Sequence, residues 1–90
     1  MNIGIVGASG LVGQVLLAEL LETFGDSYSI YLFCSETTST KSLELNGQKW
    51  ILKPITRLLD IPLDVCFFAT PTNVSEEWIP KILEKNTFVI

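Results

Sequence analysis

Histidine is missing from this sequence, and basic residues are few. Six basic residues stand against ten acidic ones, which gives a net charge of −4 at pH 7. The basic residues are spread along the chain, so we expect no nucleic acid partner bound through a basic face. The absence of histidine removes the side chain that most often serves as an acid and base near neutral pH.

Long apolar runs are missing as well. A membrane-spanning helix needs about 20 consecutive apolar residues, whereas the longer runs here, such as 65–69, have the length of a strand. No basic leader precedes an apolar run near the N-terminus, so we expect neither a signal peptide nor a membrane partner. The two cysteines, Cys34 and Cys66, lie inside apolar runs. This favours buried thiols in a reducing cytoplasm over a disulfide.

The chain is rich in apolar residues instead. They make up 48% of its 90 residues, which indicates a packed core rather than disorder. The length fits one domain or a piece of one. A chain this short buries roughly two-thirds of its unfolded surface, so we expect a thin margin of stability.

The first third of the sequence predicts a strand, a helix and a parallel strand. Residues 2–6 form a short segment with β-branched side chains that is bounded by glycine, as is typical of a buried strand. Residues 11–24 are expected to form an amphipathic helix that ends at Gly25, and residues 28–34 form the second strand. A crossover of this length implies parallel pairing. The expected apolar face of the helix consists of Val12, Val15, Leu16, Ala18, Leu20 and Leu21.

The remainder predicts a small departure from a plain Rossmann half. Asn46-Gly47 between two short apolar runs, 43–45 and 49–52, predicts a β-hairpin where a second helix would be expected. The other elements that we expect are a strand at 64–69, a helix capped by Asn73 or Ser75, a second helical piece at 80–85 starting with Pro80 and ending at Asn86, and a strand at 87–90. The fold class is therefore α/β: a Rossmann-like parallel sheet with flanking helices and a small β-hairpin insertion.

The turn after the first strand carries the strongest functional signal. Its spacing is Gly7-x-x-Gly10-x-x-Gly13. In dinucleotide-binding folds the first glycine allows the sharp turn, the second lets the pyrophosphate approach the backbone, and the third lets the helix pack closely on the strand. Backbone N–H groups of Leu11, Val12 and Gly13 would then point at the phosphates. The alternative is a tight strand–helix turn without a ligand.

The polar segment after the second strand bears on the choice of cofactor. An acidic residue there binds the ribose hydroxyls of NAD, whereas polar and basic groups favour the 2′-phosphate of NADP. Glu36 could serve as the NAD-type acid. The NADP-type residues are Ser35, Thr37, Thr38 and Lys41. We expect NADP, with NAD as the alternative cofactor and a solvated polar loop as the alternative without a ligand.

A third candidate segment follows the central strand. Ala69, Thr70 and Pro71 stand where ligands of open α/β sheets bind, outside the carboxyl ends of the strands. We expect them to border the cofactor, the alternative being a plain proline turn. Trp50 and Trp78 are interpreted as packing residues. Neither cysteine is expected to be a nucleophile, because both lie within strands.

Together these segments resemble the start of aspartate-semialdehyde dehydrogenases. The run from Ile5 to Gln14 is similar to the family's opening, and 34–41 is similar to its Ala-Ser-Glu-Arg-Ser-Ala-Gly-Lys segment. The hairpin with Asn46-Gly47, the strand at 64–69, the Ser-x-x-(Phe/Trp)-x-Pro pattern at 75–80 and the strand at 88–90 extend the match. The likeness covers essentially all 90 residues but only the N-terminal portion of a family member.

The resemblance implies residue roles and a reaction. Ser9, Gly10, Leu11 and Val12 would hold the NADP phosphates. Thr37 and Thr38 would stand at the family's Arg-Ser position for the 2′-phosphate, with threonine in place of the arginine, and Ala69-Thr70-Pro71-Thr72 would replace the family's Ser-Ala-Gly-Gly. The family reduces aspartyl 4-phosphate to aspartate 4-semialdehyde with NADPH, through a cysteine nucleophile and a histidine acid–base.

Both of those catalytic residues belong to the part of the family's chain that follows. We therefore expect residues 1–90 to be the N-terminal part of a dinucleotide-binding domain, without a catalytic and dimerisation domain and with no catalytic residue of its own. We also expect an exposed sheet edge and hence a homo-oligomer. The alternatives are a non-enzymatic NAD(P)-binding homologue and a fragment of an N-acetyl-glutamyl-phosphate reductase, although Leu11-Val12 favours the first family over the latter.

Overall fold

The computed structural model describes residues 1–35, 42–45 and 47–90. Six strands form one sheet in the order β3-β4-β2-β1-β5-β6. The strands are β1 (Asn2–Val6), β2 (Ser29–Cys34), β3 (Ser42–Leu45), β4 (Gln48–Pro54), β5 (Val65–Phe68) and β6 (Phe88–Val89). The helices are α1 (Leu11–Phe24) and α2 (Thr72–Leu83), with the short 3-10 helices η1 (Gly25–Ser27) and η2 (Ile55–Asp60).

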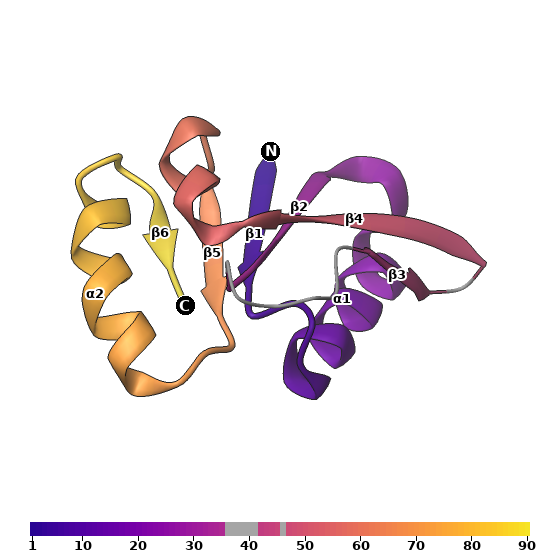
Figure 1. The fold of residues 1–90 in the computed structure, drawn as a ribbon. Coiled ribbons are helices and arrows are strands. Elements are labelled where there is room, and N and C mark those ends of the chain that lie inside the picture. Colours follow the sequence, from indigo (N-terminus) through magenta and orange to yellow (C-terminus); the bar gives the residue numbers. More distant parts are fainter. Residues whose placement is uncertain (36–41, 46) are drawn as a thin grey trace.

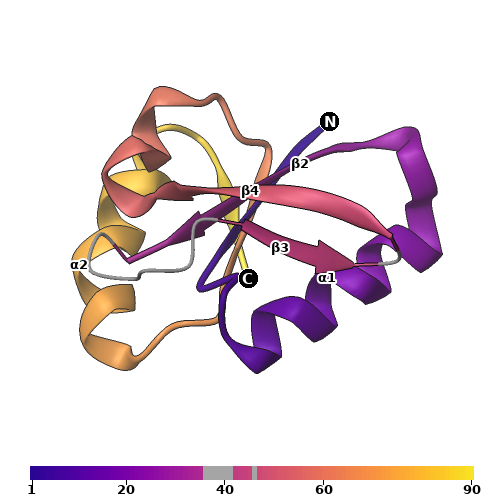
Figure 2. The same ribbon diagram turned by 45° about the vertical axis from the view of Figure 1, so that its right-hand side comes forward.

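The pairing of the strands confirms the predicted α/β class. β1 lies between β2 and β5 and is parallel to both, and β4 and β6 extend the parallel sheet on its two sides. β3 pairs with β4 in antiparallel fashion, from Ser42 opposite Ile51 to Leu45 opposite Gln48 (Figure 2). The predicted hairpin is therefore present. β4 is longer than expected, because its second half leaves β3 and joins β2.

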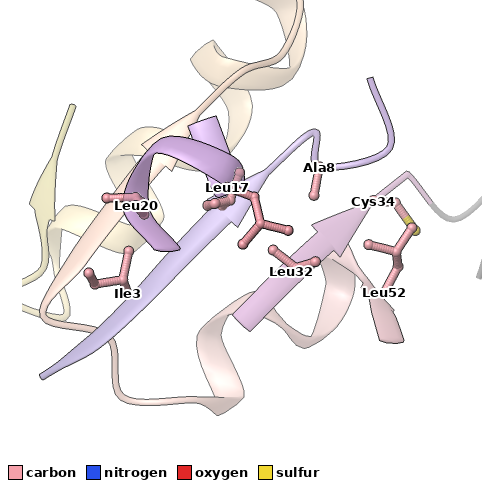
Figure 3. Packing of buried hydrophobic residues seen from close by; sticks show 8 residues of the cluster. Ile3, Ala8, Leu17, Leu20, Leu32, Cys34 and Leu52 are labelled. Atoms are coloured by element: carbon pink, nitrogen blue, oxygen red, sulfur yellow. The ribbon is translucent and has the colours of Figure 1, made fainter. Parts of the chain in front are cut away.

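The core has two parts, one on each face of the sheet. Alternate residues of a strand point to opposite faces, so Ile3 and Ile5 of β1 belong to one cluster and Val6 to the other. The first cluster is covered by α1 and is drawn in Figure 3. The second is covered by η2 and α2, which supplies the buried Ile82. The two helices thus flank the sheet from opposite sides (Figure 1).

The boundaries of α1 match the prediction, but its predicted apolar face is partly wrong. Leu17 and Leu20 are the buried leucines of the helix, whereas 69% of Val12 and 54% of Val15 is exposed. The reason is Gly13, which packs so close to the turn that an added Cβ would overlap the Gly7 carbonyl oxygen, and this packing fixes the rotation of the helix about its axis. Residues four and seven positions after Gly13 then face the sheet. Because α1 is apolar on nearly every side, hydrophobicity alone did not reveal this rotation.

The segment after β5 also differs from the prediction. A single helix, α2, runs through Pro80, and its N-cap is Pro71 rather than Asn73 or Ser75. Pro80 removes only its own bond to the carbonyl group four residues earlier, and both Pro80 and Glu76 are exposed to water. Asn86 follows in the left-handed region with φ of 61°, as expected for the residue that terminates the helical segment. The 3-10 helix η2 had no counterpart in the sequence analysis.

Candidate functional site

The glycine turn joins β1 to α1 through a set of short backbone contacts. The amides of Gly7 and Ala8 both donate to the carbonyl oxygen of Phe33, at 3.0 and 3.2 Å. The Gly10 amide donates to the Gly7 carbonyl at 3.1 Å, which closes the turn. The Gln14 side chain donates from Nε2 to the Ser9 carbonyl at 3.0 Å. The turn is therefore tied to β2 on one side and to α1 on the other.

Two glycines of the turn are required by packing. Gly7 has φ of +88°, and a Cβ there would overlap the carbonyl oxygen of Ala69. A Cβ on Gly13 would overlap the Gly7 carbonyl oxygen and lie 2.7 Å from Cα of Ala8. The roles predicted for Gly7, a sharp turn, and for Gly13, close packing of helix on strand, are both consistent with this geometry.

Gly10 differs, because the fold does not require a glycine there. Its φ and ψ of −81° and 168° are open to any residue. Among the described residues, a Cβ at Gly10 would come within 4 Å of one atom, the Gly7 carbonyl oxygen at 3.5 Å. Space beside the backbone is thus left open at the position where a pyrophosphate would approach.

The first turn of α1 presents its backbone amides at this open space. The helical ladder begins with the Gln14 amide, which donates to the Gly10 carbonyl at 3.1 Å. The amides of Leu11, Val12 and Gly13 precede that bond, and Gly10 supplies no side-chain cap. The side chains of Leu11 and Val12 are exposed. Any contact of these residues with an anion in the turn is therefore made by the backbone.

A cavity of about 310 Å³ lies where the chain leaves β1 and β5. The Ala69 amide donates to the Val6 carbonyl at 2.9 Å, so the ends of the two strands are held side by side. This is where the chain switches from one side of the sheet to the other, and such a switch is the usual ligand crevice of an open α/β sheet. The residues that line the cavity are Val6, Gly7, Ser9, Gly10, Ser35, Ile55, Ala69, Thr70, Pro71, Val74 and Trp78.

The far wall of the cavity is the beginning of α2. The Pro71 carbonyl accepts the amides of Val74 and Ser75 at 3.1 and 3.2 Å, which starts the helix. The hydroxyls of Thr70 and Ser75 are 2.8 Å apart and joined by a hydrogen bond. This bond fixes the segment between β5 and α2, and with it the polar edge of the cavity.

The predicted site residues divide into three groups. Seven line the cavity together: Gly7, Ser9, Gly10, Ser35, Ala69, Thr70 and Pro71. Leu11, Val12 and Gly13 form the adjacent first turn of α1. Thr37, Thr38 and Lys41, together with Glu36, lie outside the described residues.

The apolar wall of the cavity was not predicted. Val6, Ile55, Val74 and Trp78 line it, and all four also belong to or pack against the second core cluster. Trp78 was interpreted as a packing residue, which is correct but incomplete. The available signal was the spacing of Val74 and Trp78, four residues apart on one helix face, next to a strand end already expected to border a ligand.

The remaining groups near the core offer little reactive chemistry. Burial raises the pKa of the Cys66 thiol to about 12, and both cysteines are buried. Among the described residues, no three side chains of His, Cys, Asp or Glu gather as metal ligands would. In that same part of the chain, no helix is both long and apolar enough to cross a membrane.

Comparison with known proteins supports a common family. A family model described as "Semialdehyde dehydrogenase, NAD binding domain" matches residues 2–90. An aspartate-semialdehyde dehydrogenase of Rickettsia typhi is 30% identical over 89 residues, 99% of this chain and 26% of the relative. An N-acetyl-gamma-glutamyl-phosphate reductase of Shouchella clausii is 34% identical over 98 residues, 100% of this chain and 28% of the relative. The chain thus spans about a quarter of the length of these curated relatives.

Solved structures show the same fold. A probable aspartate-semialdehyde dehydrogenase of Pseudomonas aeruginosa superposes with a TM-score of 0.87 at 20% identity, over 99% of this chain and 27% of that one. An aspartate semialdehyde dehydrogenase II of Vibrio cholerae gives a TM-score of 0.78 at 23% identity, over 98% and 29% of the two chains.

Proposed function

This chain belongs to the semialdehyde dehydrogenase NAD-binding domain family, and from that premise we propose that its glycine turn and cavity bind NADP(H). The observation that carries the proposal is the opening at Gly10. A Cβ at Gly7 or Gly13 would overlap backbone atoms, whereas among the described residues a Cβ at Gly10 would come near the Gly7 carbonyl oxygen alone, at 3.5 Å. A pyrophosphate placed there would meet the free amides at the start of α1.

The preference for NADP over NAD rests on side chains at the end of β2. Ser35 lines the cavity, and Thr37, Thr38 and Lys41 follow it in the sequence. Hydroxyl and ammonium groups suit a 2′-phosphate, whereas Glu36 would favour the free ribose hydroxyls of NAD. NADP is therefore the proposed cofactor and NAD the alternative.

For the whole protein we propose the reaction of an aspartate-semialdehyde dehydrogenase, the NADPH-dependent conversion of aspartyl 4-phosphate to aspartate 4-semialdehyde in amino-acid biosynthesis. Bound nicotinamide would supply the hydride. Residues 1–90 would contribute binding and orientation of the cofactor, because this sequence holds no histidine and Cys66 is a buried thiol with a raised pKa. The nucleophile and the acid–base group are assigned to a catalytic domain outside residues 1–90.

A second candidate is an N-acetyl-gamma-glutamyl-phosphate reductase, favoured by the 34% identity to the Shouchella clausii relative. Both candidates place the same cofactor on the same turn. They are separated by the reaction of the full gene product, which should reduce one acyl phosphate and leave the other unchanged. A third candidate is a non-enzymatic NAD(P)-binding homologue. It would be favoured if the native gene encoded neither a Gly-Asn-Cys-type segment nor a later histidine after Ile90.

We propose that the protein is cytoplasmic, because its two cysteines are buried within separate strands, β2 and β5, which suits thiols in a reducing compartment. We also propose that residues 1–90 form a homo-oligomer, because β6 is an edge strand of the described sheet and its Phe88, with the following Ile90, is exposed.

Thermal unfolding with and without nucleotide tests the binding proposal directly. Ligand at about 100 times its dissociation constant should stabilise the chain by about 2.7 kcal/mol. We expect an upward shift with NADP and a smaller one with NAD at equal concentration. The absence of a shift with either nucleotide would contradict cofactor binding by this chain, and a larger shift with NAD would reverse the proposed preference.

A further inference from the structure

Trp78 has an unusual position on α2. Its side chain is half-buried against the second core cluster and also forms part of the cavity wall. The Nζ of Lys81 lies 4.5 Å from the centroid of its ring and 3.8 Å from Oε2 of Glu77. Among the described residues, Lys81 does not line the cavity. The ring is therefore contacted by a cation that does not itself border the ligand space.

Building on the proposed function, we propose that Trp78 is a cofactor-binding residue: its indole is the wall against which the adenine base of the dinucleotide packs. Val6, Ile55 and Val74 complete an apolar surface around the same cavity. Such a surface suits a flat, uncharged heteroaromatic ring. Lys81 acts as a positioning residue, because it touches the indole without bordering the cavity.

The residues that line the cavity favour contact with the adenine end of the dinucleotide over contact with its nicotinamide end. Ser35, at the end of β2, lines the same cavity as Trp78, and in dinucleotide-binding sheets the end of the second strand contacts the ribose that carries adenine. Gly10 would then hold the pyrophosphate, with the adenosine half reaching toward α2.

The test compares a dinucleotide with its own adenine half. Dissociation constants for NADP and for 2′,5′-ADP are measured by calorimetry on the wild-type chain and on Trp78→Leu. Should the wild type prefer NAD, the pair becomes NAD and 5′-AMP. Loss of base–aromatic stacking should raise the dissociation constants of both ligands of the pair by the same factor, about 5- to 150-fold. Trp78→Phe keeps an aromatic ring and should retain most of the affinity.

Trp50→Phe is the matched control, because Trp50 packs against the opposite core cluster. It should bind like the wild type. In the Trp50→Phe background Trp78 is the sole tryptophan, so 2′,5′-ADP should change its fluorescence. Lys81→Met should weaken the binding of 2′,5′-ADP by about two- to fivefold and alter the fluorescence change that this ligand causes. Lys81→Arg should restore both the affinity and the fluorescence change. If Trp78→Leu does not fold, the change in Trp78 fluorescence that 2′,5′-ADP causes in Trp50→Phe still decides.

Each alternative result has a definite meaning. If Trp78→Leu weakens the binding of NADP but leaves the dissociation constant of 2′,5′-ADP unchanged, the Trp78 wall contacts the nicotinamide end and the proposal is overturned. If folded Trp78→Leu binds both ligands like the wild type, or if 2′,5′-ADP binds without changing the Trp78 fluorescence, the adenine contact is also overturned while cofactor binding stands. If the wild-type chain binds no nucleotide at all, the proposed function fails first and this inference fails with it.

Discussion

Gly10 and Gly13 stand three residues apart in the same turn but meet different surroundings. A Cβ at Gly13 would overlap the Gly7 carbonyl oxygen, whereas one at Gly10 would meet that atom at 3.5 Å. A single spacing in the sequence therefore combines a packing requirement at Gly13 with the binding role that we propose for Gly10. Substitution can separate the two.

We expect Gly10→Val to remain folded and to lose the thermal shift with NADP, because its side chain would occupy the space reserved for the phosphates. Gly13→Ala should instead lower stability by about 1–3 kcal/mol through overpacking, in spite of a gain of about 1 kcal/mol in helix propensity. Urea unfolding measures the second effect and thermal shift the first. An unchanged NADP shift in Gly10→Val would place the ligand elsewhere.

Cys66 provides a prediction for alkaline pH. Burial raises the pKa of its thiol to about 12 in the folded chain, from an ordinary value of 9.0. The folded state therefore keeps a proton that the unfolded chain releases. The stabilisation is complete below pH 9 and is lost as the pH rises from 9 toward 12, by up to about 1.4 kcal/mol per pH unit.

The measurement is the free energy of unfolding in urea at pH 7.5, 9 and 10, for the wild type and Cys66→Ala. The variant lacks the thiol, so its stability should fall less steeply above pH 9, and the difference between the two chains should narrow. Parallel curves for the two chains across this range would show that the Cys66 thiol does not titrate as its burial requires.

At the scale of an element, the rotation of α1 decides which of its apolar residues matter. Leu17 is fully buried and Val15 is 54% exposed, although both are apolar and lie on the same helix. Leu17→Ala should therefore lower stability by about 2–5 kcal/mol. Val15→Gln should change it by no more than about 0.5 kcal/mol. Equal effects in urea unfolding would mean that the helix is rotated differently about its axis.

At the scale of the whole molecule, the outer edge of the sheet predicts association. β6 is the last strand of the described sheet, and 66% of Phe88 and 62% of Ile90 is exposed. Exposed edges with apolar side chains promote pairing between chains. We expect the wild-type chain to sediment as a dimer or larger species at micromolar concentration, and Phe88→Lys to shift it toward monomer. A wild type that stays monomeric over the same range would contradict the proposed oligomer.

Local signals in the sequence were enough to predict the order of the strands, the helix α1 and the likeness to a family. These signals are glycine spacing at the end of a buried strand, apolar runs of strand length, and the Gly47 turn of the hairpin. The strand β1 and the helix α1 have the predicted bounds because each begins or ends at such a signal. Seven predicted site residues line one cavity. This too was predictable, because the carboxyl ends of parallel strands meet at one edge of the sheet.

The tertiary structure alone decided which surfaces meet. The rotation of α1 follows from the contact of Gly13 with the turn, which an apolar pattern cannot encode. Ile55 and Trp78 border the cavity only because η2 and α2 cover the same face of the sheet. Pro80 stays within α2 because the helix is held by long-range packing of Ile82, while propensity alone would have ended it. Local sequence specifies turns and strands, but contacts between distant segments depend on how those segments pack.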